Sequence, residues 1–445
     1  MRLLSPLSSN KSRATLVSML CWFTLFTIFQ FIDPFLSISH CSFPRIANDL
    51  EYDSEVSISK VLIIADPQLI DNHTYPGRLS PLLSLSKFTV DNYIYKNYVA
   101  LMNELKPQTI LFLGDLLDNG RESSDEYYEN EYQRFIKVFV DPARNREVEF
   151  ITSVPGNHDI GWADGVTEHS LERFGQHFGH PNKIIQKGNH DLILLDNLSL
   201  MNTVDKKVAE PAQSFLNTLR ETKKERTRIL FDHVTLWRDP EVQVCGASRE
   251  SKKPFPISKG YQYQTAIDEE ASLDILRAVR PDAIFSGDDH DYCQVVHSYR
   301  DSKGKEQRSL GVNVKSMSMA MGIKRPAVEL LTLYNKPVKL EKDWILNNQV
   351  VKTKGEFLDY TFDTCYLTKP YVDIVAYVFL AIIDAIWLFI SCVERKKRYV
   401  SIADNYSYDN FFESLFKNVN WLAFIKLSVI NGLLAMFLYY LFTLH

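Results

Sequence analysis

The 445-residue sequence predicts an α/β domain flanked by membrane-spanning helices. Strand-like apolar runs alternate with stretches of helical spacing, which is the pattern of a parallel sheet crossed by helices. Polar side chains of metal-ligand type directly follow several of these runs. Long apolar runs with few charged residues lie near both ends of the chain. A chain of this length can bury the core of one large domain or of two average ones.

The predicted elements of the domain alternate along the chain. The first are a strand at 58–65, a helix at 83–105, a strand at 109–113, a helix near 123–140 and a strand at 148–154. After a polar insert at 161–188 come strands at 190–196, 227–232 and 283–285, with helices near 211–222 and 269–279. Segments 294–297, 310–315 and 328–334 predict shorter strands of a second sheet. The segment 237–264 lacks periodicity and predicts a long loop, a feature that is often functional in compact domains.

Three apolar runs predict membrane-spanning helices. They cover residues 15–36, 371–393 and 420–444, and each is close to the roughly 20 residues that a spanning helix requires. Asp373 and Asp384 interrupt the second run. One such run alone is typical of a buried core helix, whereas three at the chain ends favour a membrane protein.

The charges beside these runs predict their orientation. Lysine and arginine precede the first run, acidic residues follow it, and the basic run Arg395–Arg398 follows the second. The positive-inside rule then puts the central region in a lumenal or extracellular compartment. The predicted order is a cytosolic N-terminus at 1–14, a lumenal linker at 37–57, the folded domain at 58–345, a second linker at 346–370 and a cytosolic loop at 394–419. The first run could instead be a cleaved signal peptide, but it lacks a clear small-residue cleavage site, so we expect a signal anchor.

Cysteines and sequons are compatible with a lumenal central region. Its cysteines are Cys41, Cys245, Cys293 and Cys365. They permit two disulfides in three pairings, and buried thiols are the alternative. The sequons begin at Asn72 and Asn197 and predict a glycoprotein.

The net charge does not favour a nucleic-acid partner. The chain has 50 Lys and Arg against 55 Asp and Glu, and the basic residues are scattered. A protein that follows a phosphate backbone carries a basic patch or groove. We therefore expect no nucleic-acid partner.

Candidate metal ligands come at the ends of the predicted strands. The Pro155-Gly156 pair turns the chain sharply and exposes the polar side chains after it. The candidates all offer oxygen or imidazole donors, and they are Asp66, Gln68, Asp115, Asn157, His233, Asp288 and His290. Since open parallel sheets bind ligands at the carboxyl ends of their strands, we expect one site. So many donors suit two divalent ions about 3.5–4 Å apart that clamp a phosphoryl group, without a nucleophilic Ser or Cys.

The order of these motifs resembles the calcineurin-like metallophosphoesterase superfamily. The matching motifs are ADPQ at 65–68, GDLLDNG at 114–120, GNHD at 156–159, the later His233 and GDDH at 287–290. The resemblance covers residues 60–297. It implies a four-layer αββα sandwich with two metal ions at one edge and a phosphoric ester hydrolase activity.

The resemblance also implies a role for each site residue. Asp66, Gln68, Asp115 and His290 would hold one ion, while Asn157, His233 and Asp288 would hold the other, with Asp115 bridging. His158 would be the general acid for the leaving alkoxide or a donor to the phosphoryl oxygen. Asp159 would orient His158. Asp118 and Asn119, with Gly120, would brace the Asp115 turn.

Two positions depart from the superfamily pattern. Gln68 and Asp288 stand where histidines are usual, which shifts the preference toward manganese or magnesium or weakens the site. ADPQ with SGDDHDYC between membrane helices resembles one branch, the fungal ethanolamine-phosphate phosphodiesterases that remodel glycosylphosphatidylinositol (GPI) anchors. That branch implies two Mn²⁺ ions, a GPI lipid or GPI-anchored protein as substrate, and an endoplasmic reticulum or Golgi membrane.

Other hypotheses remain open at this point. A membrane-tethered phosphatase or phosphodiesterase for another substrate would differ mainly in the loops 161–188 and 237–264. A metal-binding scaffold or cargo adaptor would have lost activity, although the presence of His158, Asp159 and Asp115 favours an enzyme. The basic run at 395–398 could contact anionic lipid or a cargo-export receptor. Nothing in the sequence predicts an oligomeric state.

Overall fold

The computed structural model describes residues 9–46, 57–346, 349–394, 416 and 418–444. The chain forms two compact units. The larger unit is Phe35–Lys369, and the smaller one combines Met1–Pro34 with Pro370–His445.

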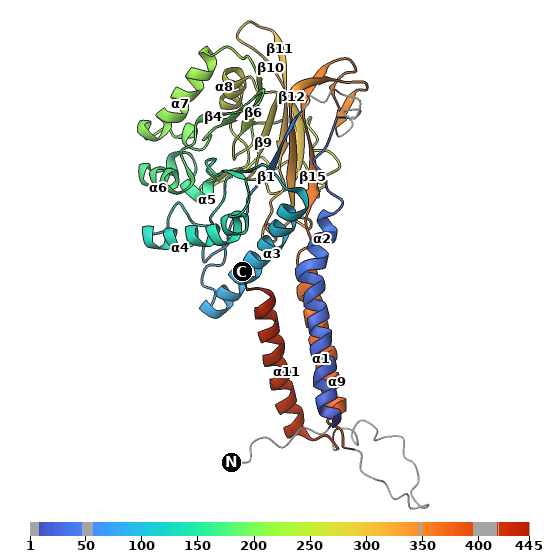
Figure 1. Cartoon of the computed structure of the whole chain (residues 1–445). Helices are drawn as coiled ribbons and strands as arrows, with labels where there is room; N and C mark the ends of the chain where they lie inside the picture. Colours follow the sequence, from blue (N-terminus) through green and yellow to red (C-terminus); the bar gives the residue numbers. More distant parts are fainter. Residues whose placement is uncertain (1–8, 47–56, 347–348, 395–415, 417, 445) are drawn as a thin grey trace, which may run out of the picture. The chain divides into compact units, whose positions relative to one another are not determined.

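Two β-sheets form the centre of the larger unit (Figure 1). The first has the order β15-β12-β1-β2-β3, with β1 (Ile58–Ile64), β2 (Thr109–Phe112), β3 (Glu149–Ile151), β12 (Ala327–Lys339) and β15 (Phe357–Tyr366). The second has the order β10-β11-β9-β6-β5-β4, with β4 (Lys183–Lys187), β5 (His190–Leu194), β6 (Thr227–Phe231), β9 (Ala283–Ser286), β10 (Cys293–Arg300) and β11 (Glu306–Asn313). Strands β1–β3 are parallel, as are β5, β6, β9 and β11. Two small hairpins pair β7 (Lys259–Gly260) with β8 (Tyr263–Gln264) and β13 (Trp344–Leu346) with β14 (Gln349–Lys352).

Helices cover the outer faces of both sheets. The helices of this unit are α3 (Ser80–Leu105), α4 (Asp125–Phe135), α5 (Asn157–Ile160), α6 (Glu168–Phe178), α7 (Lys206–Glu221) and α8 (Glu269–Val279), and a π-helical turn at Ile136–Val140 continues α4. Short 3₁₀ turns lie at Asp141–Ala143, Ala163–Gly165 and Ser199–Met201. Pro81 stands at the start of α3, and Lys106 ends this helix in a left-handed conformation.

The alternation of side chains along β1 shows the layers. Val61 and Ile63 lie in a core with Phe231 and Phe285 of the second sheet. Leu62 and its neighbour Ile64 belong to the core under the helices. Because successive strand residues point to opposite faces, the core of Val61 lies between the sheets. The predicted mixed α/β fold is confirmed, with the layer order helix, sheet, sheet, helix.

The structure corrects two sequence-based boundaries. Segment 328–334 was expected in the second sheet, but β12 pairs antiparallel with β1 in the first. The domain was expected to end at residue 345, with a linker at 346–370. Instead β15 pairs with β12 and completes the first sheet.

The smaller unit contains α1 (Ser9–Thr27), α9 (Val372–Ser391) and α11 (Trp421–Phe442). A π-helical turn (Ile28–Ile32) and α2 (Asp33–Ile38) prolong α1. Three helical segments are long and apolar enough to cross a membrane: Lys11–Ile38, Val372–Ser391 and Trp421–Phe442. Inside this unit the aromatic rings of Phe26 and Tyr377 pack 5.2 Å apart.

Two disulfides lie in the larger unit. Cys41 bonds to Cys365 and Cys245 bonds to Cys293, which selects one of the three pairings left open by the sequence. In the folded chain the sequon at Asn197 is not accessible for glycosylation. Asn197 is fully buried, and its Nδ2 donates to the carbonyl oxygen of Val234 at 2.6 Å.

A carboxyl group lies inside the first sheet. Glu329 on β12 pairs with Ile63 and is fully buried. Its Oε2 accepts a hydrogen bond from Thr364, while Oε1 has no partner among the described residues. Burial raises the pKa of Glu329 from 4.5 to about 8.

We expect Glu329→Gln to stabilise the protein in a pH-dependent way. With the folded pKa raised, the folded state keeps a proton that the unfolded state releases above its ordinary pKa. The wild type therefore loses stability as the pH rises from about 4.5 to 8. The glutamine variant, which cannot ionise, should be more stable by up to about 4 kcal/mol near pH 8.5 and almost unchanged near pH 4.5. Thermal unfolding of both proteins at the two pH values measures this difference in stability. An equal difference at the two pH values would contradict the prediction.

Candidate metal centre

The predicted ligands follow the carboxyl ends of parallel strands. Asp66 and Gln68 follow β1, and Asp115 follows β2. Asn157 begins α5 after β3. From the second sheet, His233 follows β6, while Asp288 and His290 follow β9. Parallel strands of both sheets thus bring these side chains to one edge.

Most of these positions have an unusual backbone conformation. The φ angle is +44° at Asp66, +34° at Gln68, +50° at Asp115, +66° at Asp288 and +63° at His290. Residues other than glycine rarely adopt this left-handed region, and such residues cluster at functional sites. Gly156 also lies very close to the site. A Cβ at this position would be 2.1 Å from Oδ1 of Asp115, so no larger residue fits there.

His233 lies at the centre of the donor atoms. Its Nε2 is 3.4 Å from Asp115 Oδ1, 3.7 Å from Asp288 Oδ1 and 3.1 Å from Asn157 Oδ1. Its Nδ1 donates to the carbonyl oxygen of Leu113 at 2.7 Å, which leaves Nε2 for a metal ion. Asp66, Asp115 and His233 also offer ligand atoms that all lie within 4.8 Å of one another.

The unpaired oxygens of the site fit divalent cations. Asp66 Oδ2 and Gln68 Oε1 are buried and have no hydrogen-bond partner among the described residues. Buried oxygens are almost always satisfied, and a divalent cation would satisfy these two. Oxygen donors outnumber nitrogen donors in the set, which suits manganese or magnesium.

The charges of the site lead to the same conclusion. Burial lowers the pKa of His233, but Asp115, Asp66 and Asp288 outweigh this and raise it. Burial raises the pKa of Asp66, and it raises that of Asp288 to about 7. Several carboxylates thus share a buried space with one imidazole. A divalent ion bound there would neutralise these carboxylates.

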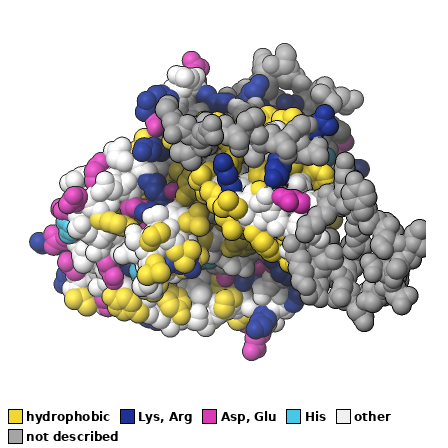
Figure 2. Space-filling model, turned by 90° about the horizontal axis from the view of Figure 1, so that it is seen from below, with side chains coloured by type: hydrophobic (Ala, Val, Ile, Leu, Met, Phe, Trp, Pro, Cys, Tyr) yellow, Lys and Arg dark blue, Asp and Glu magenta, His cyan; other side chains and the backbone are white. Residues whose placement is uncertain are grey.

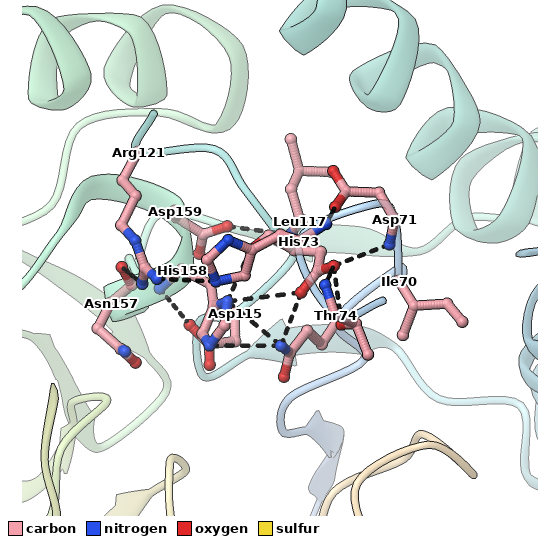
Figure 3. A network of polar contacts seen from close by, with 12 residues as sticks. Ile70, Asp71, His73, Thr74, Asp115, Leu117, Arg121, Asn157, His158 and Asp159 are labelled. Atoms are coloured by element: carbon pink, nitrogen blue, oxygen red, sulfur yellow. Dashed lines mark hydrogen bonds and ion pairs between the residues drawn. The ribbon is translucent and has the colours of Figure 1, made fainter. Parts of the chain in front are cut away.

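His158 lies beside Asp115 and Asn157, as Figure 3 shows. Its backbone N–H donates to Asp115 Oδ1 at 2.9 Å. Its ring Nδ1 is 2.6 Å from the carbonyl oxygen of Asp118 and donates to it. The side chain is 21% exposed. The Asp118 carbonyl therefore orients a partly exposed imidazole, whose Nε2 lies 3.3 Å from Gln68 Nε2 at the metal centre.

The expected role of Asp159 in orienting His158 is not what the structure shows. Asp159 is fully buried, and its carboxylate accepts hydrogen bonds from the backbone N–H groups of Leu116, Leu117 and Gly156. These bonds tie the Asp115 loop to the turn before Asn157. Asp159 thus holds the two loops together, and its carboxylate bonds to backbone N–H groups and not to the imidazole of His158.

Asp118 braces a different loop from the one expected. Its Oδ2 accepts hydrogen bonds from the N–H of Asp71 at 2.8 Å and from the N–H and hydroxyl of Thr74 at 2.9 and 2.8 Å. Its Oδ1 accepts from Gln68 Nε2 at 3.0 Å. Asp118 therefore fixes the loop after β1. Because the amide nitrogen of Gln68 faces Asp118, the amide oxygen Oε1 of Gln68 points away from Asp118.

Sequence reasoning missed Gln262, which lies between β7 and β8 in the long loop. Its carbonyl oxygen accepts from Asn157 Nδ2 at 2.9 Å, which leaves Asn157 Oδ1 facing His233. Its side-chain Oε1 accepts from the N–H of Trp162 at 2.7 Å. No periodicity in segment 237–264 marks this contact. The length of that loop was the available signal.

The same loop clamps the turn that carries Asp288 and His290. Arg249 pairs through its two terminal guanidinium nitrogens with Asp289, which lies between the candidate ligands Asp288 and His290 in the sequence. The buried Lys315 pairs with Asp291 at 2.8 Å. The Cys245–Cys293 disulfide also joins this loop to the first residue of β10, which follows the turn.

We expect Arg249→Met to weaken metal binding without removing activity. Loss of the pair with Asp289 should loosen the turn, so half-maximal activity should need about 10- to 100-fold more Mn²⁺, with kcat at saturating metal nearly unchanged. Lys253→Met, an exposed residue of the same loop, is the matched control. A fall in kcat with an unchanged metal requirement would mean that Arg249 contacts the substrate.

Buried acidic and imidazole donors at one sheet edge, beside an oriented histidine, define the chain as a metal-dependent phosphoester hydrolase. The family model of the Calcineurin-like phosphoesterases matches residues 59–292. The chain belongs to this family, so the superfamily predicted from the motifs is confirmed.

Curated relatives extend the similarity beyond the matched region. Cell division control protein 1 of Saccharomyces cerevisiae is 41% identical over 331 residues, which are 74% of this chain and 65% of that protein. The chain thus spans slightly less than two thirds of this relative. Metallophosphoesterase 1 of Gallus gallus is 25% identical over 64% of this chain and 74% of that protein. Metallophosphoesterase 1 of Xenopus laevis is 25% identical over 61% and 71%.

Proposed function

We propose that this chain is a membrane-anchored phosphodiesterase that removes ethanolamine phosphate from a mannose of the GPI glycan. The observation that carries the proposal is the oxygen-rich donor set, with Gln68 and Asp288 in place of histidines, in a chain with span-length apolar helices before and after it. A substrate anchored in a membrane suits an enzyme anchored in the same membrane. The resemblance to the fungal ethanolamine-phosphate phosphodiesterases supplies the chemical class of that substrate.

The site residues have distinct parts in this reaction. Asp66, Gln68, Asp115, Asn157, His233, Asp288 and His290 would hold two divalent ions, which we propose to be Mn²⁺. Such ions polarise a phosphoryl group and lower the pKa of a bound water. His158 donates the proton that the leaving mannose oxygen requires, because a sugar alkoxide is a poor leaving group. The Asp118 carbonyl holds Nδ1–H of the protonated imidazole, so that Nε2–H is the proton that passes to the leaving oxygen.

The proposed location is the lumen of the endoplasmic reticulum or Golgi. Two disulfides support an oxidising compartment for the larger unit. The basic run at 395–398 supports a cytosolic loop there, although it lies outside the described residues. A GPI lipid or GPI-anchored protein is the proposed partner, and a cargo-export receptor is a further one.

Glycan mass spectrometry tests the substrate. Cells that carry Asp115→Ala in place of the wild type should accumulate GPI glycans with one additional ethanolamine phosphate, which fragmentation places on a specific mannose. Glu210→Ala, an exposed residue of α7, is the control and should leave the glycans normal. Unchanged glycans in the Asp115 variant, with wild-type activity on a generic phosphodiester, would exclude the GPI substrate and leave the hydrolase.

A further inference from the structure

The first turns of α3 expose large hydrophobic side chains. Their exposed fractions are 76% for Leu79, 51% for Leu82, 57% for Leu85 and 37% for Phe88. From Val90 onward the helix buries its apolar residues under the first sheet. In Figure 1 the light-blue N-terminal end of α3 extends away from the strands. A run of exposed leucines of this kind marks an interaction surface.

Hydrophobic side chains also form exposed patches on the face of the molecule shown in Figure 2. For the patch on α3, the nearby charges indicate which occupant fits. Residues 75–90 contain no Asp or Glu, and their charged side chains are Arg78 and Lys87. Lys87 pairs with Glu131 of α4 at 2.6 Å, so Arg78 is the cation of the patch itself. The Arg78 guanidinium lies 3.5 Å from the centre of the Tyr75 ring. Exposed leucines beside the Arg78 guanidinium suit a lipid surface, whose phosphate groups lie above the acyl chains.

The chain connects α3 closely to a span-length helix. In the middle of α3, the Tyr93 hydroxyl donates to the carbonyl oxygen of Thr368 at 2.5 Å, and Asn97 Nδ2 contacts Thr368 Oγ1 at 3.0 Å. Only Lys369, Pro370 and Tyr371 separate Thr368 from the first residue of α9. The last residues of the larger unit before this apolar helix are therefore bound to α3.

From these observations we infer that residues 79–88, at the start of α3, dock into the lipid surface of the membrane that anchors the chain. The docked segment follows the loop that carries Asp66, Gln68 and His73. Docking would hold this loop, and with it the metal centre, close to lipid headgroups. The inference depends on the apolar helices spanning a membrane and not on the GPI glycan as substrate.

A fluorescent probe tests lipid contact directly. The full-length protein, with the free cysteines Cys21 and Cys392 replaced by serine, is labelled with an environment-sensitive dye at Leu82→Cys. It is then reconstituted in phosphatidylcholine vesicles that contain no other protein. The matched control is Val204→Cys, since Val204 is 78% exposed and lies before α7. Mn²⁺-dependent hydrolysis of bis(p-nitrophenyl) phosphate shows that each labelled variant is folded.

The expected result is a blue-shifted emission at position 82 that loses more than half of its intensity when the acyl chains carry bromine. The probe at position 204 should show neither effect. Equal emission at both positions, without quenching, would overturn the inference. So would a response at position 82 in native membranes alone, because a protein would then cover the helix.

Discussion

Replacing Asp115 by asparagine should abolish both metal binding and hydrolysis. Its Oδ1 lies 3.4 Å from His233 Nε2 and accepts a hydrogen bond from the N–H of His158, so this carboxylate lies inside the metal centre. Although burial alone would raise the pKa of Asp115, attraction by His233 and His158 lowers it and keeps the group ionised. An amide of the same shape removes this charge. We expect at least about a 10³-fold loss of kcat/KM, because bound metal supplies several kcal/mol of transition-state stabilisation.

Elemental analysis of the purified protein measures the metal, and bis(p-nitrophenyl) phosphate hydrolysis measures the activity. Glu210→Gln on α7 is the matched control, with the same loss of charge on an exposed side chain. Full metal content in Asp115→Asn would show that Asp115 is not a ligand.

Replacing His158 by alanine should slow turnover by roughly 10²–10⁴-fold while the metal content stays normal. His158 contacts the carboxylate of Asp115 through its backbone N–H, which the variant retains, and its ring contacts the amide nitrogen of Gln68 and not the oxygen that would bind metal. Its imidazole, partly exposed and oriented by Asp118, is available for proton donation. Since the proton matters most for poor leaving groups, the loss should be large for an alkyl phosphodiester and small for bis(p-nitrophenyl) phosphate.

Kinetics on these two substrates, with metal analysis, check the assignment. Equal losses on both would point to binding of the phosphoryl oxygens and not to proton donation. Loss of metal from His158→Ala would make this residue a ligand.

The site was predictable because its signals are local. Each apolar strand contributes its own polar residue at its carboxyl end, as β2 does with Asp115 and β6 with His233. Parallel strands bring these ends together whatever the order of strands in the sheet. Metal-ligand side chains at strand ends therefore indicated the site before any pairing was known.

Contacts between distant segments were not predictable. The pairing of β12 with β1 joins segments more than 250 residues apart, and nothing in β12 itself selects one sheet over the other. The contact of Gln262 with Asn157 comes from a loop without periodicity. From the sequence, Asp159 is expected to be a partner of its neighbour His158. In the fold its carboxylate instead accepts hydrogen bonds from the N–H groups of Leu116 and Leu117.

The left-handed backbone at Asp66, Gln68, Asp115, Asp288 and His290 has a consequence for protein engineering. Each such residue costs the fold about 1–2 kcal/mol relative to glycine, which adopts this conformation freely. A selection for heat resistance alone would therefore favour glycine at these positions and would produce robust but inactive proteins. Stabilised versions of this enzyme should be sought by substitution elsewhere, with these five positions held constant.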